Sequence, residues 1–241
     1  MLLSPQLRNF CDSWRRKAAA YALGDLGDAF DRFFTSYVVF NRLYVEATHR
    51  LARRDAVRLG YAFPDSRAAR DYVTQYCSAA VLTRSWEGNA ATAEAIHQIA
   101  AYLREHRFAL KLDPVTGQRR PDEDRALVAG LESRGKGQRA KGVLEALYAI
   151  RCNMFHGQKG FEVAQLALLR PAIVLLESTV EILYGALEQD VSFLIHRGTK
   201  TRSGELRGWC LRGLYFGAVL WIVVVTLVAQ WVPSIELRLA A

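Results

Sequence analysis

The chain has 241 residues, enough for one domain of ordinary size with an appended segment. Hydrophobic residues make up 51% of it, which excludes a wholly disordered protein, and the low count of six prolines favours helix. The net charge of +8 has two explanations, a polyanionic partner such as RNA or the orientation signal of a membrane helix. The four cysteines form no close pairs, and we predict neither a metal site nor a cofactor.

Helical periodicity dominates from residue 4 to about residue 195 and predicts an all-α fold, an antiparallel helical bundle. The predicted helices cover roughly residues 5–23, 28–59, 65–83, 89–106, 122–132, 139–155 and 161–190. The second of them has an aromatic inner face and a charged outer face. Residues 108–121 are predicted to form a loop or a short hairpin.

A stretch without charged residues runs from Gly213 to Ile235. About 20 helical residues cross a hydrocarbon core of roughly 30 Å, so this stretch predicts a single C-terminal transmembrane helix, with a buried core helix as the alternative. Basic residues are concentrated before this stretch, and only Arg238 follows it. The positive-inside rule therefore places the residues before 213 in the cytoplasm and the helix in the inner (cytoplasmic) membrane. The predicted organisation is a helical bundle over 1–195, a basic linker over 196–212, the transmembrane helix over 213–235 and a short tail over 236–241.

The predicted 139–155 helix ends in the string IRCNMFHG, in which four residues separate Arg151 from His156. This string, together with the aromatic run FFTSYVVFNRLY at residues 33–44, resembles the HEPN superfamily, whose signature is an arginine and a histidine separated by four to six residues. The resemblance implies a HEPN-like bundle and a metal-independent endoribonuclease in which two motifs face each other across a symmetric homodimer. It further implies a role in defence or stress response. An unrestrained ribonuclease harms its host, so a regulatory partner is expected.

Acid–base chemistry on RNA suits these two residue types. When the 2′-OH attacks the adjacent phosphate, a histidine can take or give the proton near neutral pH, and an arginine can meet the charge on the phosphate oxygens. The products would carry 2′,3′-cyclic phosphate ends. On an ideal helix, residues five apart differ by about 140° in direction and about 7.5 Å in height. Arg151 and His156 therefore meet one substrate only if the helix loosens at its end or if two chains contribute.

Asn153 is the third catalytic candidate, and a hydrogen bond to a neighbouring helix is the equally supported alternative for it. The alternative for His156 is a favourable interaction with the helix dipole. A glycine-broken basic loop precedes the motif helix and either contacts RNA phosphates or is merely solvated. The substrate-binding candidates in this loop are Arg134, Lys136, Arg139 and Lys141.

Two other functions are compatible with the sequence. One is a non-catalytic HEPN-like module that binds RNA or a nucleotide, or that assembles proteins at a membrane. In the other, a membrane scaffold, Arg151 is a buried structural ion paired with a glutamate such as Glu145 or Glu177. An exposed Arg151 beside His156, in a groove or a dimer seam, would instead favour catalysis.

Overall fold

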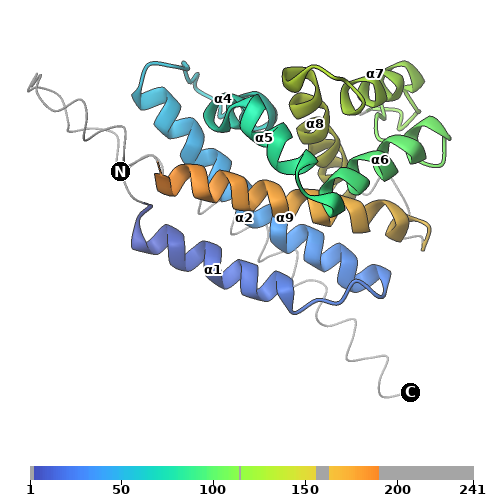
Figure 1. Cartoon of the computed structure of the whole chain (residues 1–241), viewed down its shortest axis with the longest axis horizontal. Helices are drawn as coiled ribbons and strands as arrows, with labels where there is room; N and C mark the ends of the chain where they lie inside the picture. Colours follow the sequence, from blue (N-terminus) through green and yellow to red (C-terminus); the bar gives the residue numbers. More distant parts are fainter. Residues whose placement is uncertain (1–2, 114, 156–162, 190–241) are drawn as a thin grey trace, which may run out of the picture. The chain divides into compact units, whose positions relative to one another are not determined.

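The computed structural model describes residues 3–113, 115–155 and 163–189. These residues form an all-helical domain, which confirms the predicted fold class (Figure 1). The elements are α1 (Pro5–Ala19), α2 (Leu26–Arg53), α3 (Asp65–Arg67), a π-helical turn η1 (Ala68–Tyr72), α4 (Val73–Cys77), α5 (Ala79–Glu87), α6 (Ala90–Arg104), α7 (Pro121–Leu131), α8 (Lys136–Phe155) and α9 (Gln165–Gln189).

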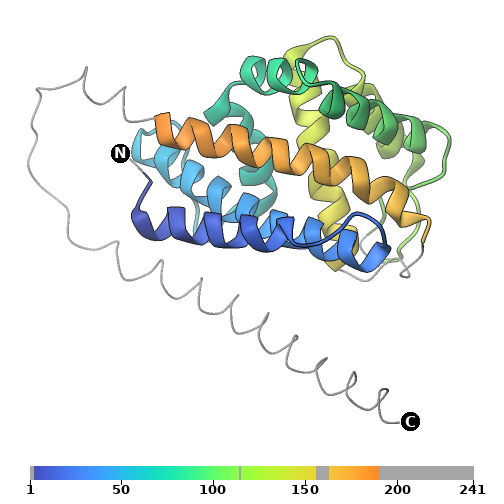
Figure 2. The same ribbon diagram turned by 60° about the horizontal axis from the view of Figure 1, so that its bottom comes forward.

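Three long helices, α1, α2 and α9, lie side by side with their axes roughly aligned (Figures 1 and 2). The helices α4 to α8 cover one side of this group. In both views α8 runs across α2 and α9 rather than along them. This crossing brings the C-terminal end of α8, where Arg151 lies, against the middle of α2.

The aromatic inner face predicted for the second helix is confirmed. Phe33, Phe40 and Tyr44 of α2 are at most 1% exposed, and Phe40 and Tyr44 meet edge to face with ring centroids 5.3 Å apart. The helix starts at an Asp25 cap, whose carboxylate accepts the Asp28 backbone N–H at 3.0 Å. The aromatic stripe thus fixes which side of α2 faces the core.

Two predicted helices have different limits in the structure. The second ends at Arg53 instead of residue 59, and Asp55 just beyond it has a φ of 56° that ends the helical path. The third, predicted as one helix over 65–83, is divided into several pieces: the π-helical turn η1 lies between α3 and α4, and Ser78, with a φ of 69°, separates α4 from α5. Asp65, the first residue of α3, lies next to Tyr148 of α8.

Residues 108–121 include a short hairpin, one of the two forms predicted for them. Leu112 and Arg119 form an isolated antiparallel bridge, and the Arg120 N–H donates to the Lys111 carbonyl at 2.8 Å. Gly117 has a φ of 68°, a left-handed conformation that glycine adopts without strain. The hairpin carries the chain from α6 to α7.

None of the helices in the described part of the chain is long and apolar enough to cross a membrane. The predicted linker, transmembrane helix and tail, over 196–241, lie outside the described residues. The membrane anchor therefore stays a prediction from the sequence.

Helices α7 and α8 approach each other through two glycines. A Cβ atom at Gly142 would stand 2.7 Å from the backbone carbonyl carbon of Gly130. We expect Gly142→Ala to lower the free energy of unfolding by about 1–3 kcal/mol, because the two backbones must move apart. Urea denaturation measures this, and Gly137→Ala in the first turns of the same helix is the control, since nothing lies within 4 Å of its Cβ position. Equal stability of the two variants would contradict the close approach.

Candidate functional site

Arg151 lies near the end of α8, with its side chain 23% exposed. The neighbouring Leu147 and Ile150 are buried and hold this end of the helix in the core. The Arg151 guanidinium carbon lies 5.7 Å from the ring centroid of Tyr37 in α2 and 5.8 Å from that of Tyr148 in α8, within the range of cation–π attraction. Arg151 is therefore neither a core residue nor a fully solvated one.

A carboxylate stands beside this guanidinium. Nη1 of Arg151 is 3.8 Å from Oδ2 of Asp65, the first residue of α3. The Tyr148 hydroxyl donates to the same Oδ2 at 3.3 Å, while the Tyr44 hydroxyl donates to Oδ1. The Asn41 amide donates in turn to the Tyr44 hydroxyl at 2.5 Å. We call these five residues, contributed by α2, α3 and α8, the Asp65 cluster.

The charges in the Asp65 cluster follow from burial. Burial raises the pKa of Tyr148 to about 12 and also raises the pKa of Tyr44 and of the neighbouring Tyr37, so all three hydroxyls stay protonated. Burial alone would lower the pKa of Arg151, but the groups around it, with Tyr37 foremost and Asp65 among them, raise it. The cluster thus contains one cation, one carboxylate and neutral tyrosine donors.

His156, the other half of the predicted motif, lies outside the described residues. The side chain of Phe155 before it is likewise not described. The separation between Arg151 and His156 therefore stays a prediction from helix geometry.

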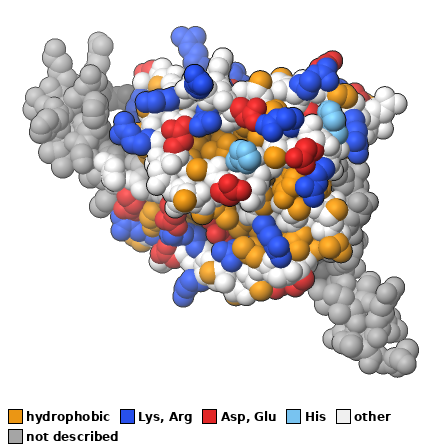
Figure 3. All heavy atoms as spheres, turned by 45° about the vertical axis from the view of Figure 1, so that its right-hand side comes forward, with side chains coloured by type: hydrophobic (Ala, Val, Ile, Leu, Met, Phe, Trp, Pro, Cys, Tyr) orange, Lys and Arg blue, Asp and Glu red, His pale blue; other side chains and the backbone are white. Residues whose placement is uncertain are grey.

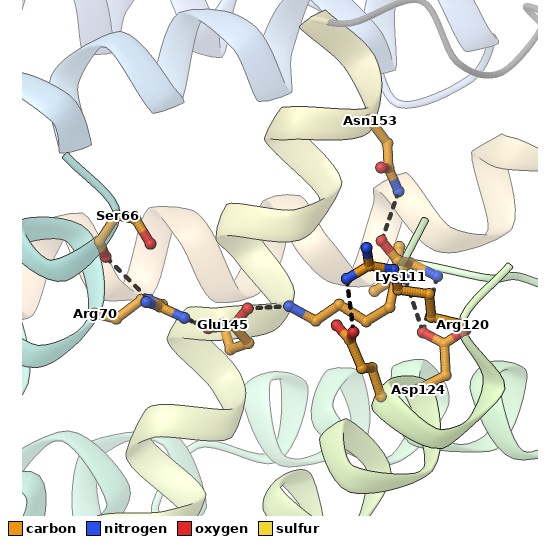
Figure 4. Close-up of polar contacts among 9 residues, drawn as sticks. Ser66, Arg70, Lys111, Arg120, Asp124, Glu145 and Asn153 are labelled. Carbon is orange, nitrogen blue, oxygen red and sulfur yellow. Dashed lines mark hydrogen bonds and ion pairs between the residues drawn. The ribbon is translucent and has the colours of Figure 1, made fainter. Parts of the chain in front are cut away.

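Asn153 is tied to the chain segment that precedes the hairpin (Figure 4). Its Nδ2 donates to the Leu110 carbonyl at 3.1 Å. The Asp124 carboxylate accepts the backbone N–H groups of Leu110 and Lys111 at 3.0 and 2.9 Å. This contact corresponds to the structural alternative for Asn153, with a loop in place of a helix as the partner, and the catalytic role of Asn153 stays a prediction.

The four basic candidates lie at the opposite end of α8 from Arg151. From Lys136 to Arg151 the helix rises by about 22 Å. Lys141 forms an ion pair with Asp71 at 3.3 Å, and Arg139 pairs with Glu87 and donates to the Leu131 carbonyl at 3.2 Å. Arg134 and Lys136 are exposed. Within one chain, the structure does not bring these basic residues together with Arg151.

Both glutamates proposed as partners of a structural Arg151 have other partners. Glu145 pairs with Arg70 and with Lys111 (Figure 4), and Glu177 pairs with Arg32 at 2.8 Å. The carboxylate found next to Arg151 is Asp65, which the sequence marked only as a possible start of the third helix. The membrane-scaffold interpretation thus does not have the ion pairs on which it was based.

The surface offers charges of both signs. On the face shown in Figure 3, Lys and Arg side chains are interspersed with Asp and Glu, and hydrophobic side chains show between them. In the described part of the chain, no group of three or more His, Cys, Asp and Glu side chains could hold a metal ion. The groups described around Arg151 are a carboxylate and tyrosine hydroxyls.

Comparison of the chain with protein-family models, with curated proteins and with solved structures found no match. The HEPN resemblance consequently rests on the motif and the helix order. The function is proposed below from the site itself.

Glu145 forms ion pairs that hold the middle of α8 against neighbouring segments of the chain. Burial acts to raise its pKa, but hydrogen bonds from Lys111 and Arg70 lower it below the usual 4.5. We expect Glu145→Gln to lower the free energy of unfolding at pH 7 by about 2 kcal/mol, since two partly buried cations lose their carboxylate. The pKa is lowered in the folded state, so this stability is present above pH 4.5 and is lost as the pH falls through the folded pKa.

Chemical denaturation at pH 7 and at pH 3 measures this difference. Glu94→Gln is the control, because Glu94 is exposed on α6, where it accepts a hydrogen bond from Gln98 at 2.9 Å. A Glu145→Gln variant as stable as the control at pH 7 would contradict the proposed role of the ion pairs.

Proposed function

We propose that this protein is a membrane-tethered, metal-independent endoribonuclease of the HEPN type that acts as a homodimer. The observation that carries the proposal is the setting of Arg151. It is a charged guanidinium, partly exposed, at the end of a helix in an all-α bundle, oriented by a carboxylate and two aromatic rings. His156 follows it by five residues in the sequence. This is the pair of groups that transesterification of RNA needs.

In the proposed reaction, the 2′-oxygen of RNA forms a bond to the adjacent phosphorus and the bond to the 5′-oxygen breaks. A histidine takes the proton of the attacking hydroxyl, and a proton is returned to the leaving 5′-oxygen. The guanidinium of Arg151 donates to the non-bridging oxygens, whose negative charge grows in the transition state. The products carry a 2′,3′-cyclic phosphate and a 5′-hydroxyl. This step consumes no water molecule.

The dimer is the part of the proposal that answers the spacing of the motif. On a regular helix Arg151 and His156 would differ by about 140° in direction, so both reach one phosphate only if the helix loosens at its end or if two chains contribute, and we propose the second case. A second copy related by a two-fold axis supplies the missing group, and an isologous pair also suits two parallel membrane anchors. Of the basic candidates, the exposed Arg134 and Lys136 are the two that we assign to more distant RNA phosphates.

The remaining parts of the proposal rest on the sequence. The helix predicted over 213–235 anchors the protein in the inner membrane with the bundle in the cytoplasm. Cleavage serves defence or stress response and is triggered by a regulatory partner. No metal or cofactor takes part in the proposed reaction.

One observation favours a second candidate, a non-catalytic module that binds RNA or a nucleotide or assembles proteins at a membrane. The Arg151 side chain is more buried than exposed and has a carboxylate 3.8 Å away, a setting also typical of a structural arginine. Under that function, replacing Arg151 changes the stability of the fold, and no RNA is cleaved.

Full-length protein in detergent, incubated with labelled RNA and EDTA, tests the proposal. We expect Arg151→Ala and His156→Ala each to lower the cleavage rate at least about 100-fold, because each removes a group that acts in the transition state. Arg16→Ala is the control, since Arg16 is an exposed α1 residue that donates to Asp12 and Ser13 of its own helix. Equal cleavage by all four proteins, or no cleavage by the dimeric parent, would reject the ribonuclease.

A further inference from the structure

Asp65 is held on both sides by tyrosine hydroxyls. Tyr44, which is 0% exposed, donates to one carboxylate oxygen, and Tyr148 donates to the other at 3.3 Å. The two tyrosines come from α2 and α8, which cross at this point. Both oxygens of the Asp65 carboxylate are therefore held by side chains of the two long helices.

The distance from Asp65 to Arg151 is informative. A direct charge-assisted hydrogen bond measures about 2.7–2.9 Å, whereas Nη1 of Arg151 is 3.8 Å from Oδ2 of Asp65. At this distance the carboxylate acts on the guanidinium chiefly through its charge. The hydroxyl of Tyr148 donates to the same Oδ2 at 3.3 Å and so competes with Arg151 for it.

A carboxylate so placed has two effects on an anion that approaches Arg151. It orients the guanidinium, because opposite charges attract at short range in a partly buried site. It also repels the anion, because its own negative charge lies within a few ångströms of the place where a phosphate oxygen would bind. The same carboxylate therefore improves the orientation of Arg151 and weakens the binding of an anion to it.

We propose that Asp65 is a positioning residue that aims Arg151 at an RNA phosphate and, through its charge, keeps the site from holding that phosphate tightly before reaction. The identity of the anion rests on the proposed ribonuclease function. The Tyr44 and Tyr148 hydroxyls set the distance at which Asp65 acts. The sequence gives no sign of this role, since Asp65 stands 86 positions before Arg151 (151 minus 65).

Binding of a fluorescein-labelled, fully 2′-O-methylated RNA oligonucleotide tests the proposal without cleavage. The full-length protein is titrated in detergent and EDTA, and fluorescence anisotropy is followed. We expect Asp65→Asn to bind about fivefold more tightly, because it removes one partly exposed charge at nearly constant size. The amide oxygen can still accept from one tyrosine hydroxyl, and the amide NH2 can donate to the other once that hydroxyl turns to accept. The control is Glu188→Gln, which removes a partly exposed carboxylate paired with Arg8 at 2.8 Å, far along the chain from Arg151. It should change the affinity less than twofold.

The gain must depend on Arg151. In an Arg151→Ala background, Asp65→Asn should have no effect beyond that of the control, so the two changes should be non-additive. A gain that persists without Arg151, an equal gain in Glu188→Gln, or no binding by any of these proteins would overturn the proposal.

Tyr148→Phe gives a second route that leaves the charge of Asp65 in place. Without that hydroxyl, Oδ2 is released to pair more closely with Arg151, and oligonucleotide binding should weaken about twofold to fivefold. Circular dichroism and the thermal midpoint show whether each variant is folded. Unchanged binding by a folded Tyr148→Phe protein would contradict the role assigned to Tyr148.

Cleavable RNA then separates this inference from the proposed function. If the parent cleaves, Asp65→Asn should lower both KM and kcat, since tighter ground-state binding is accompanied by a less well aimed guanidinium. A lowered kcat with an unchanged KM would show a purely structural effect and overturn the proposal. If binding responds as expected while the parent cleaves no RNA, Asp65 is assigned to an anion site and the ribonuclease is rejected.

Discussion

A partly buried positive charge at the crossing of α2 and α8 is the constraint on which this site depends. A buried guanidinium is costly unless polar and charged groups surround it. The fold meets this cost with groups from three elements: two tyrosine rings beside the Arg151 cation, the Asp65 carboxylate, and the hydroxyls that hold the carboxylate in place. The aromatic face of α2 thus serves both as core and as one wall of the site.

The rest of α8 is fixed along its length by contacts of other kinds. Gly142 lets α7 approach at one end, Glu145 binds two cations in the middle, and Asn153 bonds the Leu110 carbonyl two residues beyond Arg151. Such fixation matters for a residue that must meet a phosphate in a defined direction. Asn153 accordingly contributes to the site at least through the position of the helix end.

Periodicity in the sequence was sufficient to predict the all-α class and the buried face of α2, because helix packing repeats every three to four residues. It was insufficient at Asp55 and Ser78, where single residues with positive φ end or divide helices without a proline or glycine signal. Asp65 lies between these two positions, at the start of α3, where the sequence also predicts a helix to begin. A local sequence pattern does not show that α2, α3 and α8 meet at Asp65, because these contacts join residues far apart in the chain.

For the candidate site, the sequence predicts the key residue but not its contacts. The motif identifies Arg151, and residues 33–44 are predicted to carry an aromatic face, but the link from Tyr44 to Asp65 and Tyr148 requires knowledge of how α2, α3 and α8 meet. The sequence leaves open whether the basic loop contacts RNA phosphates or is merely solvated. A straight helix separates Lys136 from Arg151 by about 22 Å.

The most direct test of the account is the chemistry of the ends that the protein leaves on RNA in EDTA, read by mass spectrometry. Attack by the 2′-hydroxyl, assisted by Arg151 and His156, predicts a 2′,3′-cyclic phosphate on one fragment and a 5′-hydroxyl on the other. A 3′-hydroxyl paired with a 5′-phosphate would show that water had attacked the phosphorus, and it would contradict the account.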